Sequence, residues 1–118
     1  MPLTQSPLTT DALAQLFASD PATATAQVAQ RARAGDLHAQ VLYAQLLCEG
    51  RGMERAPEEG LHWYTVAATA GHLGAMNMVA RCHERGYGTA QDPALAALWY
   101  KRAADGGLEW AMYNLANL

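Results

Sequence analysis

The sequence predicts an all-α fold, an α/α superhelical solenoid of about seven helices, and two observations lead to this prediction. The first is composition: 51% of the 118 residues are hydrophobic but only 8% are aromatic, because much of the apolar fraction is alanine. Small side chains fill a core only where secondary-structure elements pack closely together, which favours helices over sheets. The second is an internal repeat with a period of 36 residues, a length typical of stacked helical hairpins.

The repeat is seen when residues 35–70 are set over residues 71–106. Eleven of these 36 positions are identical, and they include glycine, proline and tryptophan, which match by chance less often than alanine. The same shift extends forward into the last residues of the chain. The pattern predicts a flexible lead-in over 1–9, a degenerate N-terminal helical hairpin over 10–34, repeats over 35–70 and 71–106, and a partial repeat or C-terminal capping helix over 107–118.

Each repeat predicts two helices. Residues 37–49 have apolar side chains at helical spacing, and Gly50 ends the stretch. A second helix begins at Pro57, or after Asp92-Pro93 in the next repeat, because aspartate is a good N-cap and proline a good first helical residue. These signals predict helices at 10–18, 21–34, 37–49, 57–70, 73–85, 93–105 and 108–117.

Charge and hydropathy exclude several classes of partner. The formal net charge is −3, so no cationic field is available to hold nucleic-acid phosphates. No apolar run is long enough to span a bilayer, and the N-terminus has neither the basic start nor the hydrophobic centre of a signal peptide. We therefore expect a cytoplasmic protein without a membrane span, in which Cys48 and Cys82 are small buried hydrophobes rather than a disulfide.

Two stretches contain the same motif: AQVLYAQLLCEGRGMERAPEEGLHWYTVAATAG and AMNMVARCHERGYGTAQDPALAALWYKRAADGG. Both have two glycines after the first helix, a Trp-Tyr pair in the second, and an alanine pair before the closing glycine. This unit resembles the Sel-one-like repeat, a tetratricopeptide-type helical hairpin, over about residues 35–118. The chain departs from the family pattern at Ala56, where an aspartate is usual, and at Leu47 and His83, where a tyrosine is usual.

The resemblance implies a non-enzymatic scaffold or adaptor that binds a peptide or protein surface, often in bacterial pathways. Some secreted, cysteine-rich relatives bind or hydrolyse β-lactams and have a disulfide in each repeat. Cys48 and Cys82 stand at different repeat positions, so that regular pairing is absent here. A β-lactam- or cell-wall-fragment-binding hydrolase is the alternative function, and a protein that neutralises a toxin or effector is another.

Other candidate sites have simpler explanations. The pairs Trp63-Tyr64 and Trp99-Tyr100 recur at one repeat position, which is typical of core packing rather than of stacking on a base or sugar. The histidines and cysteines form no clear ligand pair at helical spacing, and no serine or cysteine lies in an elbow motif. We expect no catalytic residue, no metal and no cofactor.

In this architecture the first helix of each hairpin lines the concave face, so its side chains that point away from the core form a candidate groove. Guanidinium, amide and aromatic groups at these positions suit peptide carboxylates, backbone amides and apolar anchors. The alternative is a solvated helix face in which glutamates balance the arginines. The candidate partner-binding residues are His38, Val41, Gln45, Asn77, Arg81, Arg85, Trp110, Tyr113 and Asn117.

The last predicted helix allows two arrangements. If Trp110, Tyr113 and Leu118 are exposed, their apolar surface favours a homodimer or a partner contact. If the helix is itself a cap, Trp110 and Leu118 fold inward against Trp99. We expect the second arrangement.

Overall fold

The computed structural model describes residues 10–50 and 53–118, and these residues form an all-α fold, as the sequence predicts. The observed helix bounds lie within one residue of the predicted ones. The predicted lead-in over residues 1–9 lies outside the described residues. The helices are α1 (Thr10–Ser19), α2 (Pro21–Arg33), α3 (Leu37–Glu49), α4 (Pro57–Thr69), α5 (Leu73–Arg85), α6 (Pro93–Asp105) and α7 (Glu109–Ala116).

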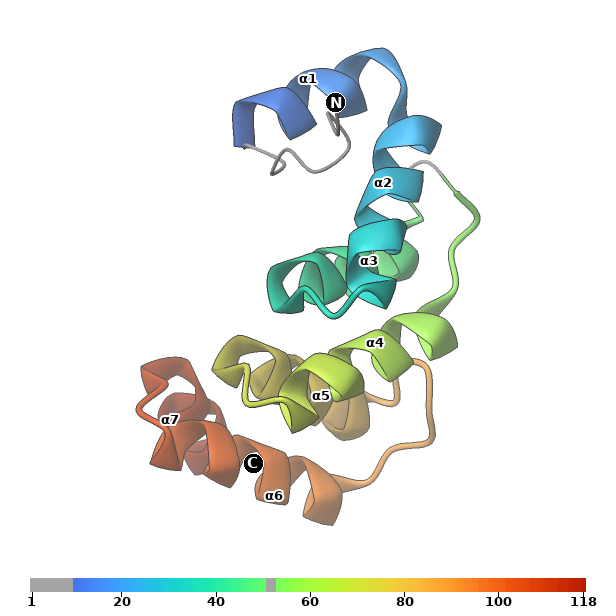
Figure 1. Ribbon diagram of the computed structural model, residues 1–118. Helices are drawn as coiled ribbons and strands as arrows, with labels where there is room; N and C mark the ends of the chain where they lie inside the picture. Colours follow the sequence, from blue (N-terminus) through green and yellow to red (C-terminus); the bar gives the residue numbers. More distant parts are fainter. Residues whose placement is uncertain (1–9, 51–52) are drawn as a thin grey trace.

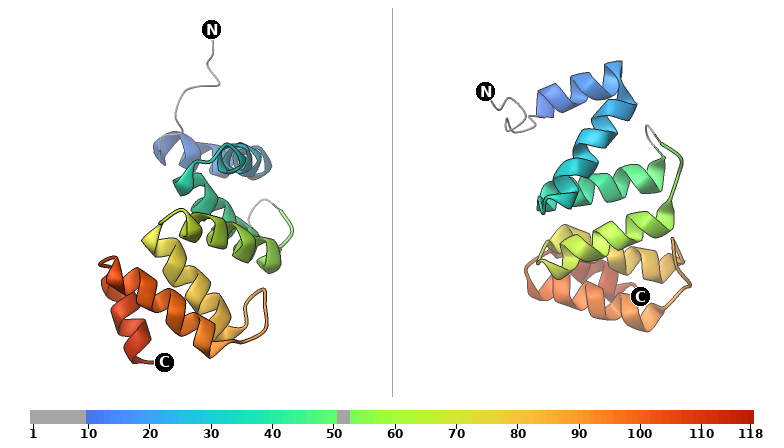
Figure 2. Two further views of the ribbon diagram at one scale, coloured as in Figure 1. Left: turned by 60° about the horizontal axis from the view of Figure 1, so that its bottom comes forward. Right: turned by 45° about the vertical axis from the view of Figure 1, so that its right-hand side comes forward.

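The helices stack in the order of the chain. Each one packs mainly on its sequence neighbours, α3 on α4 and α5 on α6 within the two repeats, and α4 on α5 between them (Figure 1). Two further views show the same progression from the N-terminal to the C-terminal end (Figure 2). The result is an elongated solenoid with extents of 49 × 28 × 21 Å.

The core is divided into three layers that follow the stack. In the second layer, between α3, α4 and α5, Tyr64 is buried among alanines, and in the third, between α5, α6 and α7, Tyr100 takes the same role. The prediction of core packing is confirmed for these tyrosines, which are 3% and 1% exposed. Trp63 and Trp99 are half-buried at the edges of the layers, and the Arg102 guanidinium lies 5.0 Å from the centre of the Trp99 ring.

Gly60 allows α4 to lie close to α3. A Cβ atom at this position would overlap Sγ of Cys48 and would lie 3.0 Å from the carbonyl oxygen of Ala44. The equivalent position in the next repeat is the buried Ala96, and there the residue equivalent to Cys48 is Glu84. The two hairpins therefore share one packing scheme but fill this contact with different side chains.

The helix N-termini show how far the repeats have diverged. Asp36 and Asp92 cap α3 and α6, accepting hydrogen bonds from backbone N–H groups at 3.0 and 3.1 Å. At α5 the Nδ1 atom of His72 accepts a hydrogen bond from the N–H of Ala75 at 3.0 Å, so a histidine takes the capping role that Asp36 has at α3. Ala56, at the start of α4, provides no side-chain cap.

We expect Ala56→Asp to raise the free energy of unfolding by about 1 kcal/mol. The backbone at Ala56 has φ −139° and ψ 76°, close to the −149° and 85° of Asp92, so the new carboxylate can accept from the free N–H groups of α4. Asp92→Ala is the matched opposite and should lower the free energy of unfolding by a similar amount. Urea unfolding followed by circular dichroism measures both, and a less stable Ala56→Asp protein would contradict the equivalence of the two caps.

The expectation that Trp110 and Leu118 fold inward is wrong. Trp110 is 71% exposed and Leu118 is 47% exposed, while Ala111 is fully buried and Leu115 packs against the third core layer. The reason is register: Trp110 lies 36 residues after Gly74, on the helix face that points away from the core. Met112 and Tyr113 of α7 are exposed as well.

Candidate functional site

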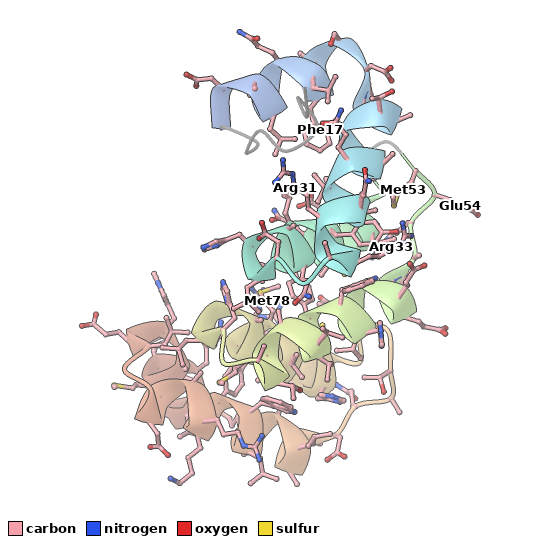
Figure 3. All side chains as sticks on the ribbon, viewed as in Figure 1. Phe17, Arg31, Arg33, Met53, Glu54 and Met78 are labelled. Atoms are coloured by element: carbon pink, nitrogen blue, oxygen red, sulfur yellow. The ribbon has the colours of Figure 1, made fainter. Side chains whose placement is uncertain are left out.

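A groove with a volume of about 760 Å³ runs along the first helices of three successive hairpins, α3, α5 and α7. Among the residues labelled in Figure 3, Met78 on α5 lines the groove. Pro57 and Tyr64 of α4 also contribute, and residues that flank the helices supply the rest. The lining residues are Val41, Gln45, Cys48, Glu49, Arg55, Pro57, Tyr64, His72, Gly74, Asn77, Met78, Arg81, Cys82, Tyr87, Leu108 and Trp110.

Five of the nine residues proposed from the sequence lie together in this groove. Val41 and Gln45 come from α3, Asn77 and Arg81 from α5, and Trp110 from α7. They occupy equivalent faces of three helices, because the helical spacing within each hairpin and the period of 36 between hairpins both hold.

The other four lie elsewhere. His38 lines a separate hollow of about 200 Å³ at the junction of α1, α2 and α3, although its ring meets that of His72 edge-on with centroids 5.9 Å apart. Arg85 is exposed and hydrogen-bonds Tyr87 rather than sharing a ligand site with Arg81, and this contact raises the pKa of Arg85. Tyr113 lines a separate hollow together with Glu109 and Trp110, and Asn117 donates to the Tyr113 carbonyl at 2.7 Å.

Sequence reasoning missed two groove thiols, Cys48 and Cys82, and the labelled Met78. The signal was present, since Cys48 continues the spacing of Val41 and Gln45 by one more turn of α3. Cys48 and Cys82 are predicted as buried hydrophobes because cysteine is mostly buried, and the sequence led to no prediction for Met78. In the structure they belong to both regions: they pack against core residues and also line the groove.

The polar groups of the groove differ in whether they already have partners. Gln45 donates to a carboxylate oxygen of Glu49 at 3.2 Å, and Nε of Arg55 donates to the Cys48 carbonyl at 2.9 Å. Within the described part of the chain, the Arg81 guanidinium makes no hydrogen bond and no ion pair. The groove thus contains two guanidinium groups and one carboxylate, in a chain whose net charge is −3.

The two thiols are held in their protonated form. Burial raises the pKa of the Cys82 thiol to about 11, and burial also raises the pKa of Cys48. The hydroxyl of Tyr64 lies near both, and burial is the main reason that its pKa is raised as well. Because the thiolate is the nucleophile, these groups favour packing over covalent catalysis at neutral pH.

We expect Cys82 in the folded protein to react with an aromatic disulfide reagent at pH 8 at least tenfold more slowly than in the urea-unfolded chain. Raising the pKa from about 9 to about 11 lowers the thiolate fraction at pH 8 roughly 100-fold, which the greater intrinsic nucleophilicity offsets only in part. A Cys48→Ser variant isolates the signal of Cys82. Equal rates in the folded and unfolded proteins would indicate an activated thiol and would favour a hydrolase.

Comparison with models of known protein families shows to which family this chain is related. The family model described as Sel1 repeat matches residues 37–72 and 74–108, together more than half of the chain. The chain belongs to the Sel1 repeat family. The two matched units contain the hairpins α3–α4 and α5–α6, whose first helices form most of the groove. A search of curated proteins found no match.

Solved structures of other Sel1-like proteins share this fold. A Sel1 repeat protein from Oxalobacter formigenes is 27% identical, with a TM-score of 0.75 over 90% of this chain and 96% of that one. A protective antigen of uropathogenic Escherichia coli, c5321, is 20% identical with a TM-score of 0.80, over 87% of this chain and 23% of that one. Helicobacter pylori cysteine rich protein B is 12% identical with a TM-score of 0.74, over 79% and 70%.

Membership of the family has a general functional meaning. Sel1 repeat proteins are generally protein-interaction scaffolds and are typically non-enzymatic. Among the described helices, none combines the length and the hydrophobicity needed to cross a bilayer.

Proposed function

We propose that this Sel1 repeat protein is an interaction scaffold that binds an extended segment of a partner protein in the groove along α3, α5 and α7. The observation that carries this proposal is the unpaired Arg81 guanidinium, half-buried in a groove about 760 Å³ in volume. A half-buried cation without a partner lowers stability, whereas a ligand that pairs with it recovers the lost interaction.

The shape of the groove supports a polypeptide ligand. Three helices from successive repeats line it, which suits an extended ligand that contacts several repeats, and Trp110 at one end is 71% exposed. Exposed tryptophan and partly buried arginine are the residue types that most often dominate protein interfaces. The thiols form no disulfide, which is consistent with the reducing bacterial cytoplasm that we propose as its location.

Selection from a random peptide library tests this proposal. Peptides that bind the wild-type protein are synthesised, and their affinities are measured by fluorescence polarisation. Gln45→Trp fills the groove from an exposed position on α3 and should weaken binding at least tenfold, since it displaces the ligand. Gln27→Trp places the same side chain at an exposed position on α2, outside the groove, and should leave affinity unchanged. Equal binding by both variants would refute a groove site.

A second contact is proposed on α7, where a homodimer would cover apolar surface. Met112 is 49% exposed, Tyr113 is 65% exposed and Leu118 is 47% exposed. Met112 and Leu118 are equivalent to Met76 and Cys82, both of which pack in the core layers around α5. Cross-helix packing with a second copy would remove this surface from water.

We therefore expect light scattering at about 100 μM to give the mass of a dimer, and Met112→Lys to give the mass of a monomer. The charged side chain would be placed in the contact, at a position already 49% exposed in the single chain, so folding should be unaffected. Leu98→Lys, on the exposed side of α6, is the control that should remain dimeric. A monomeric wild-type protein at this concentration would contradict the contact.

A further inference from the structure

The amide of Asn77 is oriented by a contact between hairpins. Nδ2 of Asn114 on α7 donates to Oδ1 of Asn77 on α5 at 3.0 Å. Since the carbonyl oxygen of the Asn77 side chain is engaged, the group that remains for a ligand is its NH₂, a donor. Arg81 follows four residues later on the same face of α5 and adds further N–H donors. The centre of the groove therefore has two neighbouring donor groups.

The nearby carboxylates do not satisfy these donors. Glu49 accepts from Gln45 at 3.2 Å, and Glu84 accepts a hydrogen bond of 2.7 Å from the hydroxyl of Tyr100. Glu84 does not line the groove. Glu49 and Glu84 thus each accept a hydrogen bond from another residue, and within the described part of the chain neither is bonded to Arg81.

Apolar side chains lie on either side of the two donors. Val41 and Met78 are groove residues of α3 and α5, and Leu108 and Trp110 form the end at α7. At the other end, Pro57 is the first residue of α4 and Tyr87 comes from the loop after α5. A ligand that complements this lining has one negative charge between apolar side chains.

We propose that the groove binds an extended protein segment in which an acidic side chain is flanked by apolar residues, with its carboxylate held by Arg81 and Asn77. This inference rests on the proposed function and names the class of partner. Carboxylate pairing with guanidinium is a charge-assisted interaction, roughly twice as strong as a neutral hydrogen bond. The chain as a whole has a net charge of −3, so a preference for a negatively charged ligand comes from the local groups of the groove.

Three capped pentapeptides test the inference: acetyl-Ala-Leu-Glu-Leu-Ala-amide and the same peptide with Gln or Lys at the centre. Each is titrated into the ¹⁵N-labelled protein, and the shifts of the backbone amides and of the Asn77 side-chain amide are followed by NMR. We expect the Glu peptide to shift the groove residues and to bind about tenfold more tightly than the Gln peptide, with the Lys peptide weakest. Arg81→Gln should bring the Glu and Gln peptides to nearly equal affinity.

The result separates this inference from the function on which it rests. Equal affinities of the three peptides, or unchanged discrimination in Arg81→Gln, would overturn the acidic preference, and so would the absence of shifts with the Glu peptide at millimolar concentration. Library peptides that bind the wild-type protein and are blocked by Gln45→Trp would still support a groove site in that case. An unchanged amide spectrum of free Arg81→Gln outside α5 confirms that the variant folds.

Discussion

Gly88→Ala is expected to lower the free energy of unfolding by about 3 kcal/mol, the largest stability effect that we predict. Gly88 has a φ of +73°, a left-handed conformation that costs an alanine roughly 1–2 kcal/mol. A Cβ atom would also lie 2.5 Å from the carbonyl oxygen of Pro57 and 2.8 Å from its carbonyl carbon. Because these are backbone atoms, the clash cannot be relieved by turning a side chain.

The contact matters for the groove as well as for stability. Gly88 lies in the loop between α5 and α6, whereas Pro57 begins α4, so their close approach joins the two repeats. Pro57 and Tyr87, the residue before Gly88, both line the end of the groove. Displacing this loop should therefore weaken peptide binding even at temperatures where the protein stays folded.

Gly86→Ala is the matched control for Gly88→Ala. Its φ of +76° imposes the same backbone strain, but the nearest atom to its Cβ is Cγ of the flexible, exposed Gln91 side chain, at 3.1 Å. We expect a loss of about 1–2 kcal/mol from strain alone. Urea unfolding of both variants measures the difference, and equal losses would show that the loop does not press on Pro57.

Arg81→Glu is expected to weaken binding of the central-Glu pentapeptide by at least 100-fold. The substitution removes the pairing guanidinium and places a like charge beside the ligand carboxylate, in a groove where water is partly excluded. At 25 °C a 100-fold change corresponds to about 2.7 kcal/mol. NMR titration or calorimetry of the wild-type and variant proteins gives the ratio.

Lys101→Glu separates this local effect from a change in total charge. Lys101 is exposed on α6 and its one ion pair, with Asp105 at 2.9 Å, joins two exposed side chains, so its loss should cost little stability. The net charge changes by the same amount in both variants. We expect peptide affinity to stay within about twofold of the wild-type value in Lys101→Glu. An equal loss in both variants would indicate long-range electrostatics rather than contact at Arg81.

The fold was predictable because residues at the helix ends signal where helices begin and stop, and because the 36-residue repeat indicates which helices occupy equivalent positions. Asp92 and Pro93 start α6, and Gly50 and Gly86 end α3 and α5 with φ of +77° and +76°. Such local signals depend on a few neighbouring residues, so one sequence suffices to read them. The predicted membership of a Sel1-like family is likewise confirmed by the matched repeats.

The site was predictable only in part, because a groove is defined by contacts between hairpins. Val41, Gln45, Asn77, Arg81 and Trp110 follow from helix periodicity alone. The hydrogen bond between Asn77 and Asn114 joins residues 37 positions apart, and no local pattern indicates it. The inward folding predicted for Trp110 is wrong because it treated α7 as a cap, whereas the repeat period places Trp110 at the position of Gly74, on the groove side of its helix.

Photo-cross-linking tests the groove most directly. A benzophenone amino acid replaces Tyr87, an exposed aromatic residue of the groove, or Leu98, which is exposed on α6 outside it, and each protein is irradiated with a bound library-selected peptide. A binding groove predicts an adduct from position 87 that excess unlabelled peptide suppresses, and none from position 98. An adduct from position 98 alone, or adducts of equal yield from both positions, would contradict binding in the groove.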